Sequence, residues 1–191
     1  MCAEVDMLVD AAQGQYKPLF RLAGYSGMRS SELAGLRYED INFDRGIIEV
    51  RRSATYGIEA QTKTPAGRRT VYVDTLTLQM LREHLAGRRA GLLFQTKFGT
   101  HLKAGDINRI VLKPLCMKLG IPNGTTHSFR HGRISLMVAS RLPDKFVRSQ
   151  VGQVNQKITN HYTHFLDQEN HEMVNEVLLR GQNSKLWSTV N

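Results

Sequence analysis

The hydrophobic period of the chain changes twice along its length, and this change limits the folds that it can adopt. In the first 36 residues the apolar positions recur at helical spacing. Residues 46–74 contain short segments that are rich in β-branched side chains and alternate roughly between apolar and polar positions, as half-buried strands do. From Thr75 onward the helical period returns. The sequence therefore predicts a mixed domain, mainly α with a small antiparallel β-sheet.

The limits of the expected elements follow from the same patterns. Helices are expected at residues 5–12, 16–25, 30–36, 75–89, 106–120, 129–142, 144–152 and 170–181. Pro114 must start or kink the helix that contains it, because proline cannot donate a helical hydrogen bond. Strands are expected at 46–53 and 68–74, and residues 55–67 between them have turn residues at both ends around a third strand.

The length of the chain predicts one domain with its own core. The 191 residues, of which 41% are hydrophobic, are enough to bury a core without metal or disulfide support. The sequence has no low-complexity tract and no internal repeat. We expect the domain to span residues 1–180, followed by a flexible C-terminal tail at residues 181–191.

Cysteine usage and the N-terminal residues indicate a reducing compartment. Cys2 and Cys116 are far apart and form no C-x-x-C pair, and carboxylates, cysteines and histidines show no ligand spacing, so neither a disulfide nor a metal site is expected. The first ten residues carry acids where a signal peptide needs basic residues. No apolar run approaches the roughly 18 residues of a membrane helix. A cytoplasmic protein without membrane contact is therefore expected.

The positive charge is concentrated in the middle of the chain. The net charge is +9, but residues 1–59 carry 7 basic and 9 acidic side chains, residues 60–160 carry 17 and 4, and residues 161–191 carry 2 and 4. A zone with a net charge of +13 is typical of a surface that binds a polyanion, with nucleic acid as the leading candidate. Charge alone leaves DNA, RNA and a phosphorylated ligand open.

Three stretches place phosphate-binding or proton-transferring groups at the ends of expected elements. In SGMRSSELAGL, Arg29 precedes a helix, although it could simply pair with Glu32. In THSFRHGR, His127 and Arg130 are three residues apart and share one face of a helix, an arrangement that is also common by chance. The third stretch, VGQVNQKITNHYTH, contains Tyr162 among polar neighbours.

Taken in order, these stretches resemble the catalytic domain of the tyrosine recombinases, the phage integrase family. The order is G-M-R-S-S-E-L-x-x-L, a K-T between strands, H-x-x-R-H, and V-G-Q followed nine positions later by a tyrosine. The resemblance extends from about Glu4 to about Gly181 and implies the DNA breaking-rejoining fold of that family. It assigns the family's two arginines, hairpin lysine, H-x-x-R pair and tyrosine to Arg29, Lys63, His127, Arg130 and Tyr162. Without the resemblance, Lys63 would not be preferred to Arg68 or Arg69.

The chemistry of these residue types agrees with the implied activity. Two guanidinium groups, Arg29 and Arg130, can bind the non-bridging oxygens of a phosphodiester bidentately and stay charged at physiological pH. Tyr162 is then the nucleophile that forms a 3′-phosphotyrosine ester, His127 is the best-placed base, and the family implies that Lys63 protonates the leaving 5′ oxygen. Such a set needs no metal and no cofactor.

One position departs from the family pattern. The family usually has histidine or tryptophan after L-G, where this chain has Gln153. Because tryptophan is accepted there, an N–H donor is what the position requires, and glutamine supplies one without carrying charge. A modestly slower enzyme is expected. His131, His161 and His164 are nearby substitutes, but a structural or DNA-facing role is favoured for them.

The resemblance also implies partners and alternatives. Members of the family usually carry an N-terminal core-binding domain, which is expected to be absent from this chain. We expect double-stranded DNA of the nucleoid as the partner, with a homotetramer on DNA and a monomer in isolation. A type IB topoisomerase shares the chemistry, but the chain length and the H-x-x-R-H stretch favour a site-specific recombinase or integrase. The alternative from another class is a DNA-binding module derived from a recombinase and catalytically weakened, with Gln153 as its first sign of decay.

Overall fold

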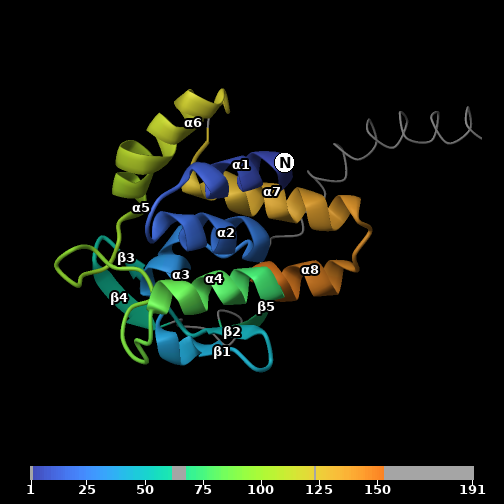
Figure 1. Cartoon of the computed structure of the whole chain (residues 1–191). Helices are drawn as coiled ribbons and strands as arrows, with labels where there is room; N and C mark the ends of the chain where they lie inside the picture. Colours follow the sequence, from blue (N-terminus) through green and yellow to red (C-terminus); the bar gives the residue numbers. More distant parts are fainter. Residues whose placement is uncertain (1, 62–67, 123, 153–191) are drawn as a thin grey trace, which may run out of the picture. The chain divides into compact units, whose positions relative to one another are not determined.

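The computed structural model describes residues 2–61, 68–122 and 124–152, and its N-terminal part is organised around one buried helix, α2 (Tyr16–Ser26). Both α1 (Cys2–Ala11) and α7 (Thr126–Ala139) pack against α2 (Figure 1). α2 ends at Gly27, which adopts a left-handed φ of 68° and donates its N–H to the carbonyl of Ala23. The short helix α3 (Ser30–Gly35) follows directly. The three helices predicted in this part of the sequence are confirmed.

The strands form two small antiparallel sheets. In the first sheet the order is β1 (Ile41–Asn42), β2 (Ile47–Val50) and β5 (Arg69–Tyr72), with Ile48 opposite Val71. The second sheet is a hairpin of β3 (Arg52–Thr55) and β4 (Ile58–Gln61). Tyr56 and Gly57 both have positive φ, as a two-residue hairpin turn requires.

The predicted antiparallel pairing is confirmed, but the segment expected as one strand at 46–53 is divided between the two sheets. The division has a packing reason. β3 lies against α3, and the backbone of Ser53 approaches Gly35 so closely that a Cβ at Gly35 would lie 3.1 Å from the Cα and carbonyl carbon of Ser53. The chain therefore leaves the first sheet after Val50 to follow α3.

Helices make up most of the remaining described chain. α4 (Thr75–Leu85) begins at Asp74, whose carboxylate caps the N–H of Thr77, and α4 packs against α2. The helix expected at 106–120 is a continuous run of α5 (Ala104–Asp106), a π-helical turn η3 (Ile107–Leu112) and α6 (Lys113–Leu119). Pro114 stands in the first turn of α6, as its missing N–H requires. A short 3₁₀ turn, η1 (Tyr38–Asp40), precedes β1.

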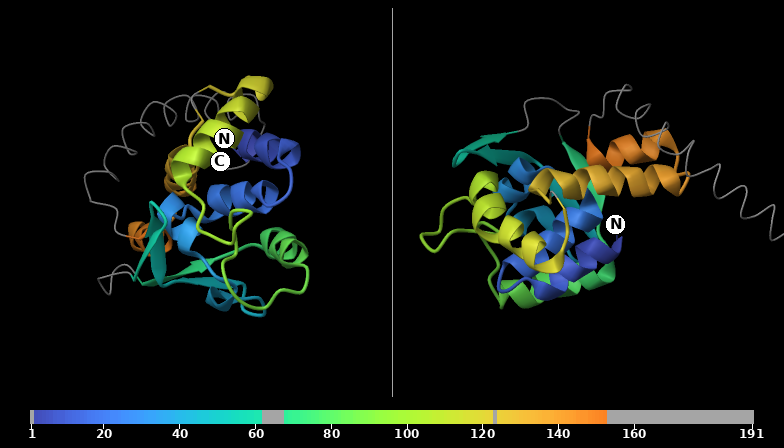
Figure 2. Two further views of the ribbon diagram at one scale, coloured as in Figure 1. Left: turned by 90° about the vertical axis from the view of Figure 1, so that its left-hand side faces the viewer. Right: turned by 90° about the horizontal axis from the view of Figure 1, so that it is seen from above.

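α7 and α8 (Asp144–Val151) lie side by side at the C-terminal end of the described chain (Figure 2). A capping box between Thr125 and Ser128 starts α7, so His127 and Arg130 lie within one helix. α8 also contacts β5, which brings the end of α8 to the first residue of that strand. The helix expected at 170–181 and the tail at 181–191 lie outside the described residues.

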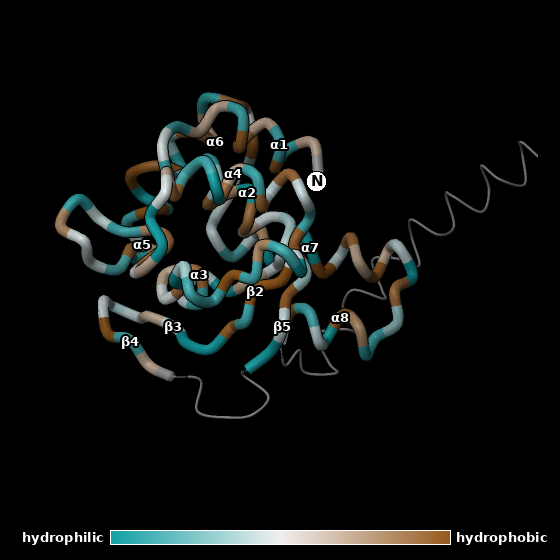
Figure 3. Tube along the Cα trace, turned by 60° about the horizontal axis from the view of Figure 1, so that its bottom comes forward, coloured by the Kyte–Doolittle hydropathy of each residue, from teal (hydrophilic) through white to brown (hydrophobic). Residues whose placement is uncertain are grey.

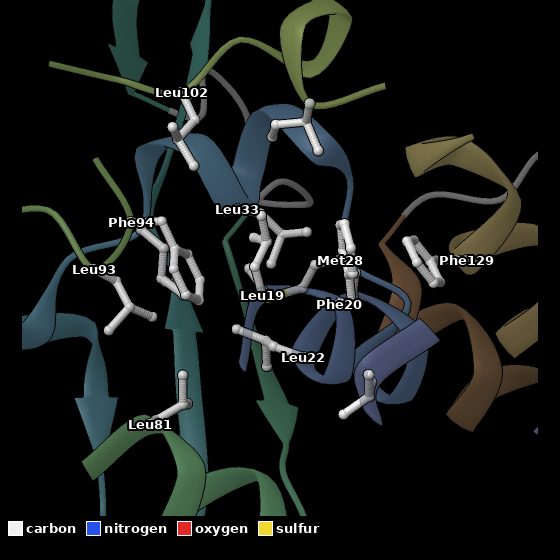
Figure 4. Close-up of a cluster of buried hydrophobic side chains, with 14 of the residues drawn as sticks. Leu19, Phe20, Leu22, Met28, Leu33, Leu81, Leu93, Phe94, Leu102 and Phe129 are labelled. Carbon is white, nitrogen blue, oxygen red and sulfur yellow. The ribbon is translucent and has the colours of Figure 1, made fainter. Parts of the chain in front are cut away.

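The core joins most of the helices to the first sheet. Phe20 of α2 stacks on Phe129 of α7 with ring centroids 5.5 Å apart. Figure 4 shows the surrounding aliphatic and aromatic side chains, which are Leu19, Leu22, Met28, Leu33, Leu81, Leu93, Phe94 and Leu102. Cys116 is buried in this core. Within the described ranges, no helix is both long enough and apolar enough to cross a membrane.

Candidate active site

Arg29 stands between the core and the solvent at the start of α3. The preceding residue, Met28, is buried in the core and anchors the backbone next to Arg29. The backbone N–H of Arg29 donates to Glu32 Oε2 at 2.8 Å and its Nη1 donates to Glu32 Oε1 at 2.8 Å, so the local pairing considered from the sequence is present. Its Nη2 donates to the carbonyl of Gly152 at 3.1 Å. The side chain remains 38% exposed, so its guanidinium can be reached from solvent.

Arg130 reaches the same carbonyl from α7. It follows the buried Phe129 and is itself only 6% exposed. Its Nη1 donates to the carbonyls of Gly27 and Val151 at 2.8 and 2.6 Å, and its Nη2 donates to the carbonyl of Gly152 at 3.1 Å. The two arginines that the sequence singled out thus meet at Gly152, immediately before Gln153.

Glu32 and Arg69 complete this cluster. Arg69, the first residue of β5, donates both Nη1 and Nη2 to the carboxylate of Glu32 at 2.8 Å, and its Nε donates to the carbonyl of Gln150 at 2.9 Å. Burial alone would raise the pKa of Glu32, but the hydrogen bonds and charges of Arg69 and Arg29 outweigh it and lower that pKa. Glu32 is therefore a buried carboxylate that stays ionised.

The end of α8 supplies backbone acceptors to all three arginines. The carbonyl of Gln150 accepts from Arg69, that of Val151 from Arg130, and that of Gly152 from both Arg29 and Arg130. The last carbonyls of a helix have no partner within the helix and carry the negative end of its dipole. The guanidinium groups thus cap α8 at the point where the chain continues to Gln153.

His127 lies one turn before Arg130 on α7 and is exposed. Its ring contacts the ring of His131 edge to face, with centroids 4.6 Å apart. Burial, followed by the charges of His127 and Arg130, lowers the pKa of His131. The helix therefore places a solvent-accessible imidazole close to the arginine cluster.

A basic cleft of about 610 Å³ opens beside Arg69. It is lined by Glu49, Val50, Arg51, Arg52, Arg68, Arg69 and Thr70. Figure 3 shows the hydrophilic stretch between β2 and β3 and the hydrophilic start of β5 that form this region. Arg68 is exposed and makes no ion pair within the described part of the chain, whereas Arg52 is held by Asp40 at 2.7 Å. A larger open cleft of about 790 Å³, between α1, α2 and α4, contains none of the predicted site residues.

Comparison with protein families tests the resemblance that the motifs suggested. The model of the phage integrase family matches residues 2–169. The chain belongs to the phage integrase family. The match includes every predicted site residue, so the identification made from the order of the motifs is confirmed.

Relatives within the phage integrase family are recombinases and integrases. A XerC-like tyrosine recombinase of Caldanaerobacter subterraneus is 27% identical over 196 residues, which cover 87% of this chain and 50% of that protein. The prophage integrase IntR of Escherichia coli is 40% identical over 81 residues, which cover 42% of this chain and 20% of the relative. The matched part of this chain spans about half the length of the XerC-like relative and 20% of the length of IntR.

Solved structures of the family share the fold. The XerA recombinase superposes with a TM-score of 0.73 at 22% identity, covering 91% of this chain and 62% of that chain. The integrase of transposon Tn1549 in complex with transposon right end DNA superposes with a TM-score of 0.72 at 20% identity, covering 85% of this chain and 60% of that chain. The predicted fold is therefore confirmed.

Only some of the predicted site residues lie in the part of the chain that the structure describes. Arg29, His127 and Arg130 lie in the described residues, while Lys63, Gln153 and Tyr162 lie outside them, as do His161 and His164. Sequence reasoning missed the pairing of Arg69 with Glu32. The available signal was a pair of arginines at the start of a strand whose other residues alternate in the usual way.

Proposed function

We propose that this member of the phage integrase family is the catalytic domain, at residues 1–180, of a site-specific DNA recombinase or integrase that cuts and rejoins strands through Tyr162. The observation that carries the proposal is the convergence of Arg29 and Arg130 on the carbonyl of Gly152. The relatives are named as recombinases and integrases, and some of the similar solved structures are complexes with DNA.

The charge of the cluster fits a phosphodiester substrate. In the part of the cluster that the structure describes, Arg29 and Arg69 pair with the carboxylate of Glu32, while Arg130 binds backbone carbonyls, which leaves a formal excess of two positive charges. Carbonyl dipoles compensate part of this excess, since charged groups removed from water need partners. A phosphate whose negative charge increases in the transition state would complete the compensation, and this is how an anion-stabilising site lowers a barrier.

In the proposed reaction the Oη of Tyr162 attacks the phosphorus and the bond from phosphorus to the 5′ oxygen breaks. The exposed guanidinium of Arg29 binds one non-bridging oxygen, and Arg130 binds the other in exchange for one of its backbone carbonyl acceptors. His127 takes the proton of the tyrosine and Lys63 protonates the departing 5′ oxygen. The phosphotyrosine ester retains the bond energy, so a second 5′ hydroxyl reseals the strand in the reverse of these steps without metal or cofactor.

The side chain of Gln153 is proposed to donate a hydrogen bond to the reacting phosphate. It follows Gly152, whose carbonyl both site arginines bind. A neutral amide donor contributes less than a charged one, so a slower reaction than with histidine is expected.

Binding of duplex DNA is proposed to use the basic cleft beside Arg69. Contacts of arginine and lysine with phosphate fix the register of the duplex, and they make affinity fall steeply with salt. Arg68 and Arg69 of the cleft lie in the zone of the sequence that carries the excess charge, and Arg51 and Arg52 come from the segment before it. We propose that the domain is monomeric alone, assembles as a tetramer on two duplexes, and acts on nucleoid DNA in the cytoplasm.

A nicked suicide substrate tests the proposal. Wild type, Tyr162→Phe and a control, Tyr72→Phe, are incubated with the DNA without metal and resolved on a denaturing gel. Tyr72 is an exposed tyrosine of β5. A covalent protein–DNA band from wild type and Tyr72→Phe, but not from Tyr162→Phe, is the expected result.

Other outcomes would favour the alternatives. A wild type that binds the duplex and forms no adduct would support the DNA-binding module, for which Gln153 is the motivating departure. Adduct formation together with relaxation of supercoiled plasmid, but with no exchange between two duplexes, would support a type IB topoisomerase.

A further inference from the structure

Each of the three guanidinium nitrogens of Arg69 donates a hydrogen bond within the domain. Its side chain is 6% exposed, Nη1 and Nη2 donate to Glu32, and Nε donates to the carbonyl of Gln150. Its neighbour Arg68, by contrast, is exposed. Because this guanidinium is buried and each of its nitrogens is bonded within the domain, we infer that it contributes to a reaction through the groups that it holds.

Arg69 lies against both groups that orient Arg29. Arg29 donates to Glu32 through Nη1 and to the carbonyl of Gly152 through Nη2. Glu32 is bound bidentately by Arg69, and Gly152 lies against it, because a Cβ on Gly152 would be 2.8 Å from Nη1 of Arg69. Arg69 thus binds one acceptor of the Arg29 guanidinium, Glu32, and packs against Gly152, the residue that supplies the other.

Resting on the recombinase function proposed above, we propose that Arg69 is a positioning residue for the reaction: it neutralises and holds Glu32 and packs against Gly152, and in this way it keeps in place the two acceptors that aim Arg29 at the phosphate.

The charge argument runs through Glu32. Its carboxylate is almost fully buried, and within the described residues its charged partners are Arg69 and Arg29. Without Arg69, the ionised carboxylate would depend on Arg29 alone for compensation. Glu32 would then neutralise the positive charge of Arg29, which would attract the phosphate less. With Arg69 present, Arg29, Glu32 and Arg69 together carry a net charge of +1, and the charge of Arg29 remains available to the phosphate.

A charge-balancing role for Arg69 can be distinguished from a role that only stabilises the fold. Removal of Glu32 together with Arg69 restores the net charge of the three groups, although the bond to the carbonyl of Gln150 stays lost. A charge-balancing role therefore predicts that Glu32→Gln partly rescues Arg69→Met. A purely structural role predicts that the second substitution adds to the damage, because it removes another buried hydrogen-bonding group.

The experiment measures the single-turnover rate of covalent adduct formation at saturating suicide substrate, the Kd for the uncleaved duplex, and the melting temperature. The variants are Arg69→Met, Arg69→Lys, Arg69→Met combined with Glu32→Gln, and Arg21→Met. Arg21 is the matched control, since it is also buried and ion-paired, with Asp6 at 3.2 Å and Asp74 at 3.1 Å, but lies between α2 and α4, outside the arginine cluster. All rates are taken below the melting temperature of the least stable variant.

We expect Arg69→Met to lower the saturating rate by about 10- to 100-fold, because misorientation of a transition-state donor costs this much. Its Kd should change less than about 3-fold, since most of the phosphate contacts remain. The rate of Arg69→Lys should lie between those of wild type and Arg69→Met, because an ammonium restores the charge but not the forked geometry of a guanidinium. The double variant should recover about 10-fold of the loss, and Arg21→Met should keep the wild-type rate.

Four results would overturn the inference. An Arg69→Met protein that forms adduct at the wild-type rate refutes it while the recombinase function stands. A double variant slower than Arg69→Met, or an Arg21→Met protein as slow as Arg69→Met, assigns the effect to folding. If wild type forms no adduct on DNA that it binds, the proposed function fails and the inference fails with it.

Discussion

Replacement of Gly152 by alanine tests the geometry of the site through stability alone. Gly152 has a φ of 67° and a ψ of 130°, a conformation that costs a non-glycine residue about 1–3 kcal/mol. The new Cβ would also lie 2.8 Å from Nη1, 3.0 Å from Cζ and 3.1 Å from Nε of Arg69. Since that guanidinium is held by Glu32 and Gln150, it cannot move aside without weakening charged hydrogen bonds worth about 1.5–3 kcal/mol each. A loss of about 3 kcal/mol follows.

The matched control is Gly120→Ala. Gly120 ends α6 with a φ of 69°, and a Cβ there would meet no atom within 4 Å. Only the backbone strain remains, which is about 1 kcal/mol for a left-handed alanine. Urea unfolding followed by circular dichroism measures both variants, and in a domain of this size 1 kcal/mol corresponds to about 2–4 °C in the melting temperature. If Gly152→Ala were no less stable than Gly120→Ala, the close packing of Arg69 on Gly152 would be refuted.

Three further predictions concern the core and the titrating groups. Leu81→Ala removes a fully buried side chain and should cost about 2–5 kcal/mol in urea unfolding. His131 should titrate below the ordinary histidine pKa in an NMR pH series, and its pKa should rise in His127→Ala, because burial and the neighbouring imidazole both disfavour its charged form. Because the pKa of Glu32 is lowered by folding, its ionised form contributes stability that is complete above its unfolded pKa and is lost as the pH falls through its folded pKa. Glu32→Gln should therefore be less stable than wild type at pH 7, and the difference should shrink in acid.

The elements of the fold could be read from the sequence wherever a local pattern determined them. The amphipathic period of α2 and the position of Pro114 at the start of α6 are local properties, and the structure agrees with both. The division of 46–53 between two sheets could not be read, because it depends on the approach of Gly35 to Ser53, a contact made only when α3 packs on β3. The π-helical turn at Ile107–Leu112 likewise has the same apolar spacing as an α-helix at this length.

The site shows the same difference between local and long-range information. The pairing of Arg29 with Glu32 is an i,i+3 contact, so the sequence suggested it directly. The bond from Arg69 to Glu32 joins a strand to a helix, and only the folded chain distinguishes Arg69 from the exposed Arg68. The order of motifs identified the family and assigned Arg130, but its buried guanidinium with backbone carbonyls as acceptors was not foreseen.

Those carbonyls explain how the site can keep its arginines both ordered and charged. A carboxylate partner would fix a guanidinium but would also cancel its charge, and Glu32 already does this for Arg69. The carbonyls of Val151 and Gly152 at the end of α8 fix Arg29 and Arg130 through dipoles, which orient a guanidinium while leaving its formal charge uncancelled. A site that must bind and stabilise a phosphate needs this combination, because a transition-state donor is effective only when it is already in position and still charged. The C-terminus of α8 is thus part of the proposed binding site, and a change in its position would displace both arginines at once.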